Sequence, residues 1–210
     1  MSPRIFIYGI VVALAACAAP PATQGAPQAD VSPAKTLSVL KSSFRDKGQA
    51  KLDRLDQDET QKLCSLYDGK ALPDSVVKQI QTANQGSIKW PADGKYVGDW
   101  KNGEKIAQEG RGKQYSDNPQ GPVGGNCYAC HQLTSQEISY GTIGPSLYHF
   151  GKTRGYTDEM RRYAYGKVWN AEAYSACSNM PRFGHNGILS EQQVKDVVAL
   201  LMDPQSPVNQ

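Results

Sequence analysis

Two cysteines three positions apart, with a histidine directly after the second, constrain this chain more than any other stretch. They are Cys127 and Cys130, followed by His131, and the pattern occurs once in the 210 residues. This spacing is the attachment motif of c-type haem, in which each thiol adds to a vinyl group and forms a thioether. The adjoining histidine is then held under the iron as its proximal ligand. The motif therefore predicts one covalently bound haem c, with His131 as a ligand of the iron.

Two other kinds of site also use paired cysteines. A redox-active dithiol does not need the adjoining histidine. A structural zinc site usually needs a second Cys/His pair at comparable spacing, and the sequence has none. Haem attachment is the interpretation that the remaining features must fit.

The amino terminus carries an export signal. Arg4 precedes an apolar run, residues 5–16, that is too short to span a bilayer as a helix, so residues 1–17 are predicted to be a signal peptide. The sequence Leu-Ala-Ala-Cys ending at Cys17 fits an ordinary cleavage site among small residues, or a bacterial lipobox in which Cys17 is lipidated. Both interpretations place the protein in the periplasm. Only lipidation of Cys17 would attach it to a membrane.

Export also makes the remaining cysteines informative. With Cys17 cleaved off or lipidated, and Cys127 and Cys130 bound to haem, only Cys64 and Cys177 are left. In an oxidising compartment two such thiols are more often paired than free, which predicts a disulfide between them. Two separate buried thiols are the alternative.

Composition divides the rest of the chain into three parts. Residues 18–33 are rich in Ala, Pro and Gln and are predicted to be a flexible linker. Residues 34–90 carry apolar residues at helical spacing and are predicted to be a helical N-terminal extension. In it, Asp74 is expected to cap a helix, and the charged run 53–59 to be a solvated helix face. A turn that begins at Trp90 opens the predicted haem domain, residues 91–210.

Three helices of that domain have recognisable starts. Asp99 is expected to cap a helix over residues 100–110, whose small residues would let another helix cross closely. Thr157 precedes a helix that runs to Trp169. Ser190 and Gln193 form a capping box before the last helix, which is expected to cross the first. The formal net charge of +3 is too weakly positive to indicate nucleic-acid binding, so no nucleic-acid partner is expected.

Two further elements resemble the small class I cytochromes c. The run Gly144-Pro145-Ser146-Leu147 matches their Gly-Pro-x-Leu element, in which the proline carbonyl accepts the free N–H of the proximal histidine; a plain turn is the alternative for Pro145. Met180 lies in a loop before the last helix, where these proteins keep the distal methionine, and its soft thioether favours reduced iron. His149 and His185 are the rival ligands. The resemblance implies a mainly α chain, a class I cytochrome c-like domain with an α-helical N-terminal extension.

Motifs across residues 98–209 resemble the SoxX family, the monohaem subunits of the SoxXA cytochromes of bacterial sulfur oxidation. They include the haem block from Gly125 to Leu133, the segment Met180-Pro181-Arg182-Phe183-Gly184, and the tail Asp203-Pro204-Gln205-Ser206-Pro207-Val208-Asn209. Many cytochromes share the haem motif itself, whereas the extended haem block and the tail are far more specific. Residues before Trp90 lie outside these motifs, so the chain is similar to long forms of the family.

The resemblance implies a non-catalytic role in an enzyme complex. SoxX pairs with SoxA as a heterodimer, and the complex acts as an L-cysteine S-thiosulfotransferase that oxidatively couples thiosulfate to a cysteine of the carrier SoxYZ. The reacting cysteine of the family belongs to SoxA, so no catalytic residue is expected in this chain. Its haem would receive the electrons and pass them to a small c-type cytochrome.

Two other functions fit the same motifs. A stand-alone periplasmic monohaem cytochrome c would carry electrons in another respiratory chain and would purify without a sulfur-dependent partner. A haem-based sensor would leave Met180 unbound and would bind carbon monoxide readily.

Overall fold

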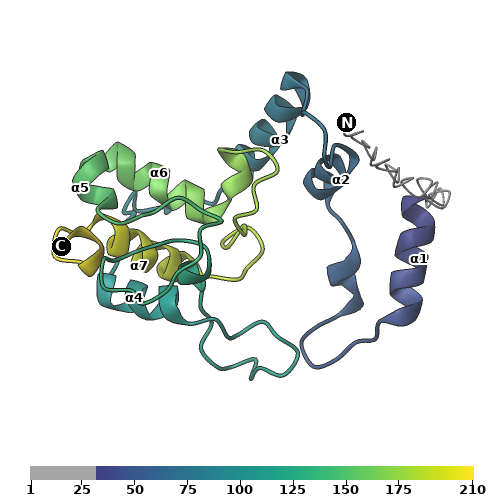
Figure 1. Cartoon of the computed structure of the whole chain (residues 1–210), viewed down its shortest axis with the longest axis horizontal. Helices are drawn as coiled ribbons and strands as arrows, with labels where there is room; N and C mark the ends of the chain where they lie inside the picture. The colour runs from purple at the N-terminus through teal and green to yellow at the C-terminus, as the bar shows by residue number, and fades with distance from the viewer. Residues whose placement is uncertain (1–31) are drawn as a thin grey trace, which may run out of the picture.

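The computed structural model describes residues 32–210, and Cys17 with nearly all of the linker lies outside the described residues (Figure 1). Over that range the chain is helical, with no β-strand beyond an isolated bridge between Lys47 and Ala50. The predicted mainly α fold is therefore confirmed. The elements are α1 (Pro33–Ser43), η1 (Leu52–Leu55), α2 (Glu59–Leu66), α3 (Asp74–Gly86), α4 (Trp100–Gln108), η2 (Cys127–Ala129), α5 (Phe150–Arg154), α6 (Asp158–Trp169), η3 (Ala171–Ala173), α7 (Glu191–Met202) and η4 (Pro207–Asn209).

Helices α4 and α7 cross closely, as the sequence predicts for the first and last helices of the haem domain. A Cβ at Gly103 of α4 would overlap the backbone carbonyl of Asp196 on α7, so only glycine fits there. The Asp196 carboxylate accepts a 2.9 Å hydrogen bond from the backbone N–H of Asp99. The Gly98 N–H donates to the carbonyl of Lys195 at 2.9 Å. The start of α4 is thus attached to α7 through the backbone.

The helix caps follow the sequence with one exception. The caps predicted at Asp99, Thr157 and Ser190 are present, and each side chain accepts a hydrogen bond from a backbone N–H in the first turn. The prediction for Asp74 is wrong, because Pro73 is the N-cap of α3 and Asp74 is its first helical residue. An acidic residue stabilises the first turn through the helix dipole as well as by capping, so its presence does not fix the boundary.

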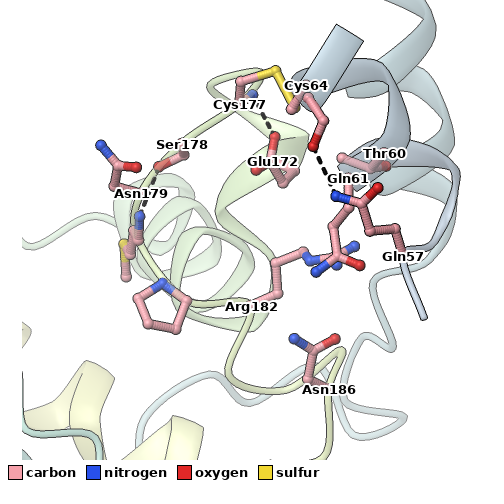
Figure 2. A pocket seen from close by; sticks show the side chains of 13 residues that line it. Gln57, Thr60, Gln61, Cys64, Glu172, Cys177, Ser178, Asn179, Arg182 and Asn186 are labelled. Carbon is pink, nitrogen blue, oxygen red and sulfur yellow. Dashed lines mark hydrogen bonds between the residues drawn. A yellow bond between two sulfur atoms is a disulfide. The ribbon is translucent and has the colours of Figure 1, made fainter. Parts of the chain in front are cut away.

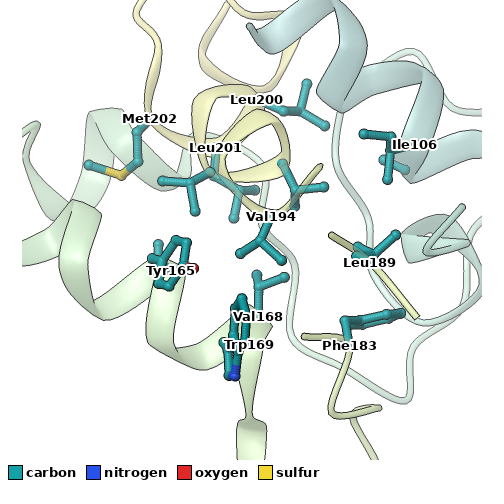
Figure 3. Packing of buried hydrophobic residues seen from close by; sticks show 14 of the residues in the cluster. Ile106, Tyr165, Val168, Trp169, Phe183, Leu189, Val194, Leu200, Leu201 and Met202 are labelled. Atoms are coloured by element: carbon teal, nitrogen blue, oxygen red, sulfur yellow. The ribbon is translucent and has the colours of Figure 1, made fainter. Parts of the chain in front are cut away.

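The core lies between α6 and α7, and Figure 3 shows its side chains. Tyr165 of α6 is fully buried, as are Val194 and Val198 of α7. Phe183 and Leu189, from the loop before α7, extend this core, and Cys127 packs against it. The apolar core therefore reaches the haem-attachment motif.

The N-terminal extension is only partly attached to this body. The buried side chain of Asn84 on α3 accepts a 2.8 Å hydrogen bond from the Asn170 side chain at the end of α6. Gln85 donates a 3.1 Å bond to the carbonyl of Ala173 in η3. In contrast, α1 has no buried residue and lies at the opposite end of the molecule from α5 (Figure 1). Helix α3 is therefore hydrogen-bonded to the haem domain, whereas α1 buries no residue.

Candidate haem site

The attachment motif forms a short 3₁₀ turn next to the end of α4. Asn126 has a left-handed backbone (φ 46°), and its N–H donates to the carbonyl of Glu109 at 3.0 Å. Within the turn, the N–H groups of Cys130 and His131 both donate to the carbonyl of Cys127, at 3.1 and 2.9 Å. These bonds hold both thiols and the histidine on one compact turn.

Both motif thiols are free, whereas the other two cysteines in the described residues form a disulfide. Cys127 packs against the apolar core, and burial raises the pKa of its thiol to about 12. The thiol is therefore neutral at physiological pH. Two free thiols at this spacing are what thioether formation to haem requires.

The proximal histidine is oriented by a backbone carbonyl. His131 Nδ1 lies 2.7 Å from the carbonyl oxygen of Pro145, which leaves Nε2 available to an iron atom. Gly144 packs against the imidazole so tightly that a Cβ there would overlap the ring. Its N–H donates to the carbonyl of Cys130 at 2.9 Å, which keeps the two segments together. A carbonyl acceptor on the second nitrogen fixes the tautomer and raises the basicity of the ligand nitrogen.

Met180 lies in the loop between η3 and α7. Its side chain is half-buried and packs against the core, and its N–H donates to the Ser178 hydroxyl at 3.2 Å. Farther along the loop, the N–H groups of Gly184 and His185 both donate to the carbonyl of Trp169 at 3.1 Å. The loop is thus anchored on the end of α6.

The two rival histidine ligands have other partners. His149 stacks on Tyr148 at 3.7 Å between ring centroids, and its Nε2 lies 2.7 Å from the backbone oxygen of Gln210. His185 is exposed, and its Nδ1 lies 3.1 Å from the Ser87 hydroxyl at the end of α3. One histidine is engaged with the carboxy terminus and the other with the extension. Met180 remains the predicted distal ligand.

The surroundings of the motif fit a haem. A Cβ built on Gly125 would meet Cys127 Sγ, Phe183 and Leu189 at 3.4 to 3.8 Å, so an apolar wall lies beside the first thiol. Among the residues that the structure describes, the buried indole Nε1 of Trp169 has no hydrogen-bond acceptor. Leaving such a donor unpaired costs about 1–3 kcal/mol, and a haem propionate oxygen is an acceptor of the right kind.

The distal loop is fastened to the extension at two places, one of which was predicted from the sequence. The predicted disulfide between Cys64 of α2 and Cys177 is present and joins residues 113 positions apart. Asp58, at the start of α2, forms a 2.6 Å ion pair with Arg182. Asp58 is exposed, as predicted for the charged run 53–59, and its carboxylate also binds the distal loop. Neither the Met-Pro-Arg sequence nor the N-cap position of Asp58 predicts this ion pair.

A buried acidic residue completes this region. Glu172 of η3 is 7% exposed, and its carboxylate accepts a 2.6 Å hydrogen bond from the N–H of Cys177. Burial raises the pKa of Glu172, against the opposing effect of the hydrogen bonds from Cys177 and Ser178 and the charge of Arg182. No group of three or more acidic, histidine or cysteine side chains that could hold a separate metal ion occurs within residues 32–210.

Comparison with known proteins agrees with these features. The cytochrome c family profile matches residues 101–203. A protein of Aquifex aeolicus (strain VF5) described as an uncharacterized lipoprotein is 36% identical over 207 residues, which cover 97% of each chain. In the part of the chain that the structure describes, no helix has the length and apolar character needed to cross a membrane.

The family match explains the geometry around the attachment motif. It confirms the class I cytochrome c-like fold, covers both motif cysteines and His131, and implies covalent haem c and electron transfer. The full-length match to the Aquifex protein includes the N-terminal extension as well as the haem domain. Residues 101–203 of this chain therefore form a cytochrome c domain.

Proposed function

We propose that this chain is the electron-transfer subunit of a SoxXA-type cytochrome and carries a single haem c. The observation that carries the proposal is the set of SoxX-like motifs across residues 98–209, which extends well beyond the haem motif. The family profile itself supports only the coarser assignment to an electron-transfer haem protein.

The most specific of these motifs has a structural use. In the tail, Ser206, Val208 and Asn209 are buried. The Asn209 amide donates to the carbonyls of Leu201 and Asp203 at 3.1 and 2.9 Å, which closes the end of α7. The tail therefore supports common ancestry with SoxX, while the proposed role depends on the haem site.

The haem site suits electron transfer because its protein groups are fixed before any electron arrives. A bound haem c supplies a one-electron couple between ferric and ferrous iron. His131 Nε2 and Met180 would bind its iron and Cys127 and Cys130 would hold it covalently, while the Pro145 carbonyl keeps the His131 ring in place. Phe183 and Leu189 provide apolar surface on the side of the first thiol. None of these residues is placed as a general base or a nucleophile.

In the proposed complex, SoxA is the partner in a heterodimer and provides the reacting cysteine. Thiosulfate is coupled to a cysteine of SoxYZ with release of two electrons. This chain receives them one at a time from a partner haem and passes them to a small c-type cytochrome. The direction of transfer agrees with methionine ligation, which raises the potential above that of two histidine ligands.

We further infer that the protein is exported to the periplasm and lipid-anchored through Cys17. The Leu-Ala-Ala-Cys sequence supports lipidation, and the Aquifex relative is described as a lipoprotein. A Cys17→Ser variant should then leave the membrane fraction and appear in the soluble periplasmic fraction. Equal partitioning of the variant and the native protein would contradict the anchor.

A second candidate is a stand-alone, membrane-tethered cytochrome c that exchanges electrons with other carriers. The lipoprotein description of the full-length relative favours it, because a tethered carrier needs no stable partner.

Gentle purification from thiosulfate-grown cells, followed by mass spectrometry, tests the two candidates. Recovery of a stoichiometric second cytochrome with its own Cys-x-x-Cys-His motif would support SoxXA, and the thiosulfate and SoxYZ assay would follow. Recovery of a lone monohaem protein would contradict SoxXA and favour the carrier.

A further inference from the structure

The segment that carries Met180 is attached to the extension on both sides of the methionine, by a disulfide, which Figure 2 shows, and by an ion pair. Cys177, three residues before Met180, forms the disulfide with Cys64. Arg182, two residues after it, forms the ion pair with Asp58. The attachments are five residues apart on the loop and six apart along α2, so α2 spans the ligand segment.

The ion pair is largely removed from solvent on the loop side. The side chain of Arg182 is 8% exposed, and that of Asp58 is 42% exposed. Such a pair is screened less than the exposed ion pairs of the extension. Asp58 also uses its other oxygen, Oδ1, to accept a 2.9 Å bond from the Gln61 N–H and so caps α2. The same carboxylate therefore starts the helix and holds the loop.

The start of the loop is fixed independently of the ion pair. Cys177 has a left-handed backbone (φ 57°), and its N–H donates to the buried carboxylate of Glu172 at 2.6 Å. In Figure 2 Glu172 lies between the disulfide and Arg182. The segment 177–182 is thus held by α2 through the disulfide and the ion pair, and by η3 through the Glu172 carboxylate.

We propose that α2 is an internal brace that keeps the Met180 sulfur on the haem iron, with Asp58 and the Cys64–Cys177 disulfide as positioning groups. The proposal rests on the proposed ligation by Met180. In this proposal the extension keeps the Met180 loop closed. Without α2 the loop would open more often, and outside ligands would reach the iron. The extension would then set the fraction of six-coordinate haem rather than only covering the domain.

The test uses Asp58→Asn in the full-length holoprotein. Asparagine keeps an oxygen for the helix cap, but its amide group faces the Arg182 guanidinium as a second donor. Loss of one hydrogen bond to a charged group should shift the opening equilibrium of the Met180 loop about tenfold. We therefore expect the carbon monoxide association rate of the ferrous protein to rise by about the same factor. The reduction potential should fall and the methionine-to-ferric-iron charge-transfer band should weaken.

Asp56→Asn is the matched control. Asp56 lies two residues away in the same extension and forms a 2.5 Å ion pair with Lys41 of α1; among the described residues it makes no hydrogen bond or ion pair with the loop. It should change neither carbon monoxide binding nor the potential. Arg182→Lys, which keeps the positive charge, should retain most of the native behaviour. Equal effects of Asp58→Asn and Asp56→Asn on both readouts would overturn the brace.

Two further variants keep the outcome decisive. The double variant Cys64→Ser with Cys177→Ser removes the other attachment and should also speed carbon monoxide binding, even if Asp58→Asn does not fold. Met180→Ala separates the brace from the ligand assignment. If Met180→Ala loses the charge-transfer band but Asp58→Asn and the serine variant bind carbon monoxide like the native protein, Met180 is the ligand. The brace proposal is then wrong. An unchanged band in Met180→Ala overturns the ligand assignment and the brace with it.

Discussion

On the proximal side of the haem site, Gly144 is the position where a side chain would be tolerated least. Its N–H is bonded to Cys130, and its Cα faces the His131 ring with no room for a Cβ. The neighbouring carbonyl of Pro145 holds the same ring through Nδ1. The orientation of the proximal ligand therefore depends on backbone atoms on one side and on a missing side chain on the other.

Replacing Gly144 with alanine should displace the imidazole and weaken proximal ligation. We expect a loss of about 1–3 kcal/mol in the free energy of unfolding of the holoprotein, the usual cost of overpacking. Denaturant titration followed by haem absorbance measures it. Gly86→Ala is the control, because a Cβ at Gly86 meets no atom within 4 Å, and it should be neutral or slightly stabilising.

Trp169→Phe tests whether the buried indole donor has an acceptor in the holoprotein. The substitution keeps an aromatic ring and removes Nε1, which has no partner among the described residues. If a haem propionate accepts this N–H, the holoprotein should lose about 1–3 kcal/mol and its potential should shift. An unchanged or increased stability would mean that the indole donor is unpaired in the holoprotein too.

Residue types, short spacings and the pairing of Cys64 with Cys177 could be predicted from the sequence, whereas the ion pair between Asp58 and Arg182 could not. The haem cysteines, His131 and the Gly-Pro element lie within 20 residues of one another, so one local pattern contains them. Arg182 and Asp58 are 124 residues apart. Their pairing depends on where α2 packs, and no periodicity or cap signal encodes that position.

At the scale of secondary-structure elements, the caps and the α4–α7 crossing were predictable because they follow from residues inside each helix. Gly103 sits where small residues were expected to allow a close approach, and the carbonyl of Asp196 fills that space. The contacts of α3 were not predictable, because they are hydrogen bonds from polar side chains to distant segments, and α2 was predictable only through its disulfide. For such helices, one disulfide and a few hydrogen bonds determine the position.

The attachment of α2 should weaken in acid. Burial alone would raise the pKa of Asp58, but the Gln61 N–H and the Arg182 guanidinium together hold that pKa below its usual value of 3.8. The unfolded chain therefore takes up a proton first. The contribution of Asp58 to the free energy of unfolding is complete above its pKa in the unfolded chain. It is lost as the pH falls through its pKa in the folded protein.

Urea titrations of the native protein and Asp58→Asn, from neutral pH down to about pH 3, measure this dependence. The native protein should be the more stable at neutral pH, and the difference should shrink on acidification. A difference that stays constant or grows toward low pH would show that the Asp58 charge does not contribute.

At the scale of the whole molecule, the extension consists of parts with different attachments. Helix α3 is bonded to α6 and η3, α2 to the distal loop, and α1 has no buried residue. Removal of residues 18–43 should leave the visible spectrum intact and reduce the unfolding free energy by no more than about 1 kcal/mol, the range of an exposed ion pair.

A longer deletion, of residues 18–66, provides the contrast, because it also removes Asp58 and Cys64. It should speed carbon monoxide binding to the ferrous protein, whereas the shorter deletion should not. The same rate in both variants would mean that α2 has no more influence on the iron than α1.

The disulfide has a consequence for biogenesis. The exported chain must oxidise Cys64 and Cys177 across 113 residues while Cys127 and Cys130, three positions apart, stay reduced until haem is attached. Closing a long loop costs more chain entropy than closing a short one, so random oxidation favours the wrong pair. Maturation therefore needs an oxidant for one pair of thiols and a reductant for the other, and a host with only an oxidising export pathway should accumulate haem-free protein.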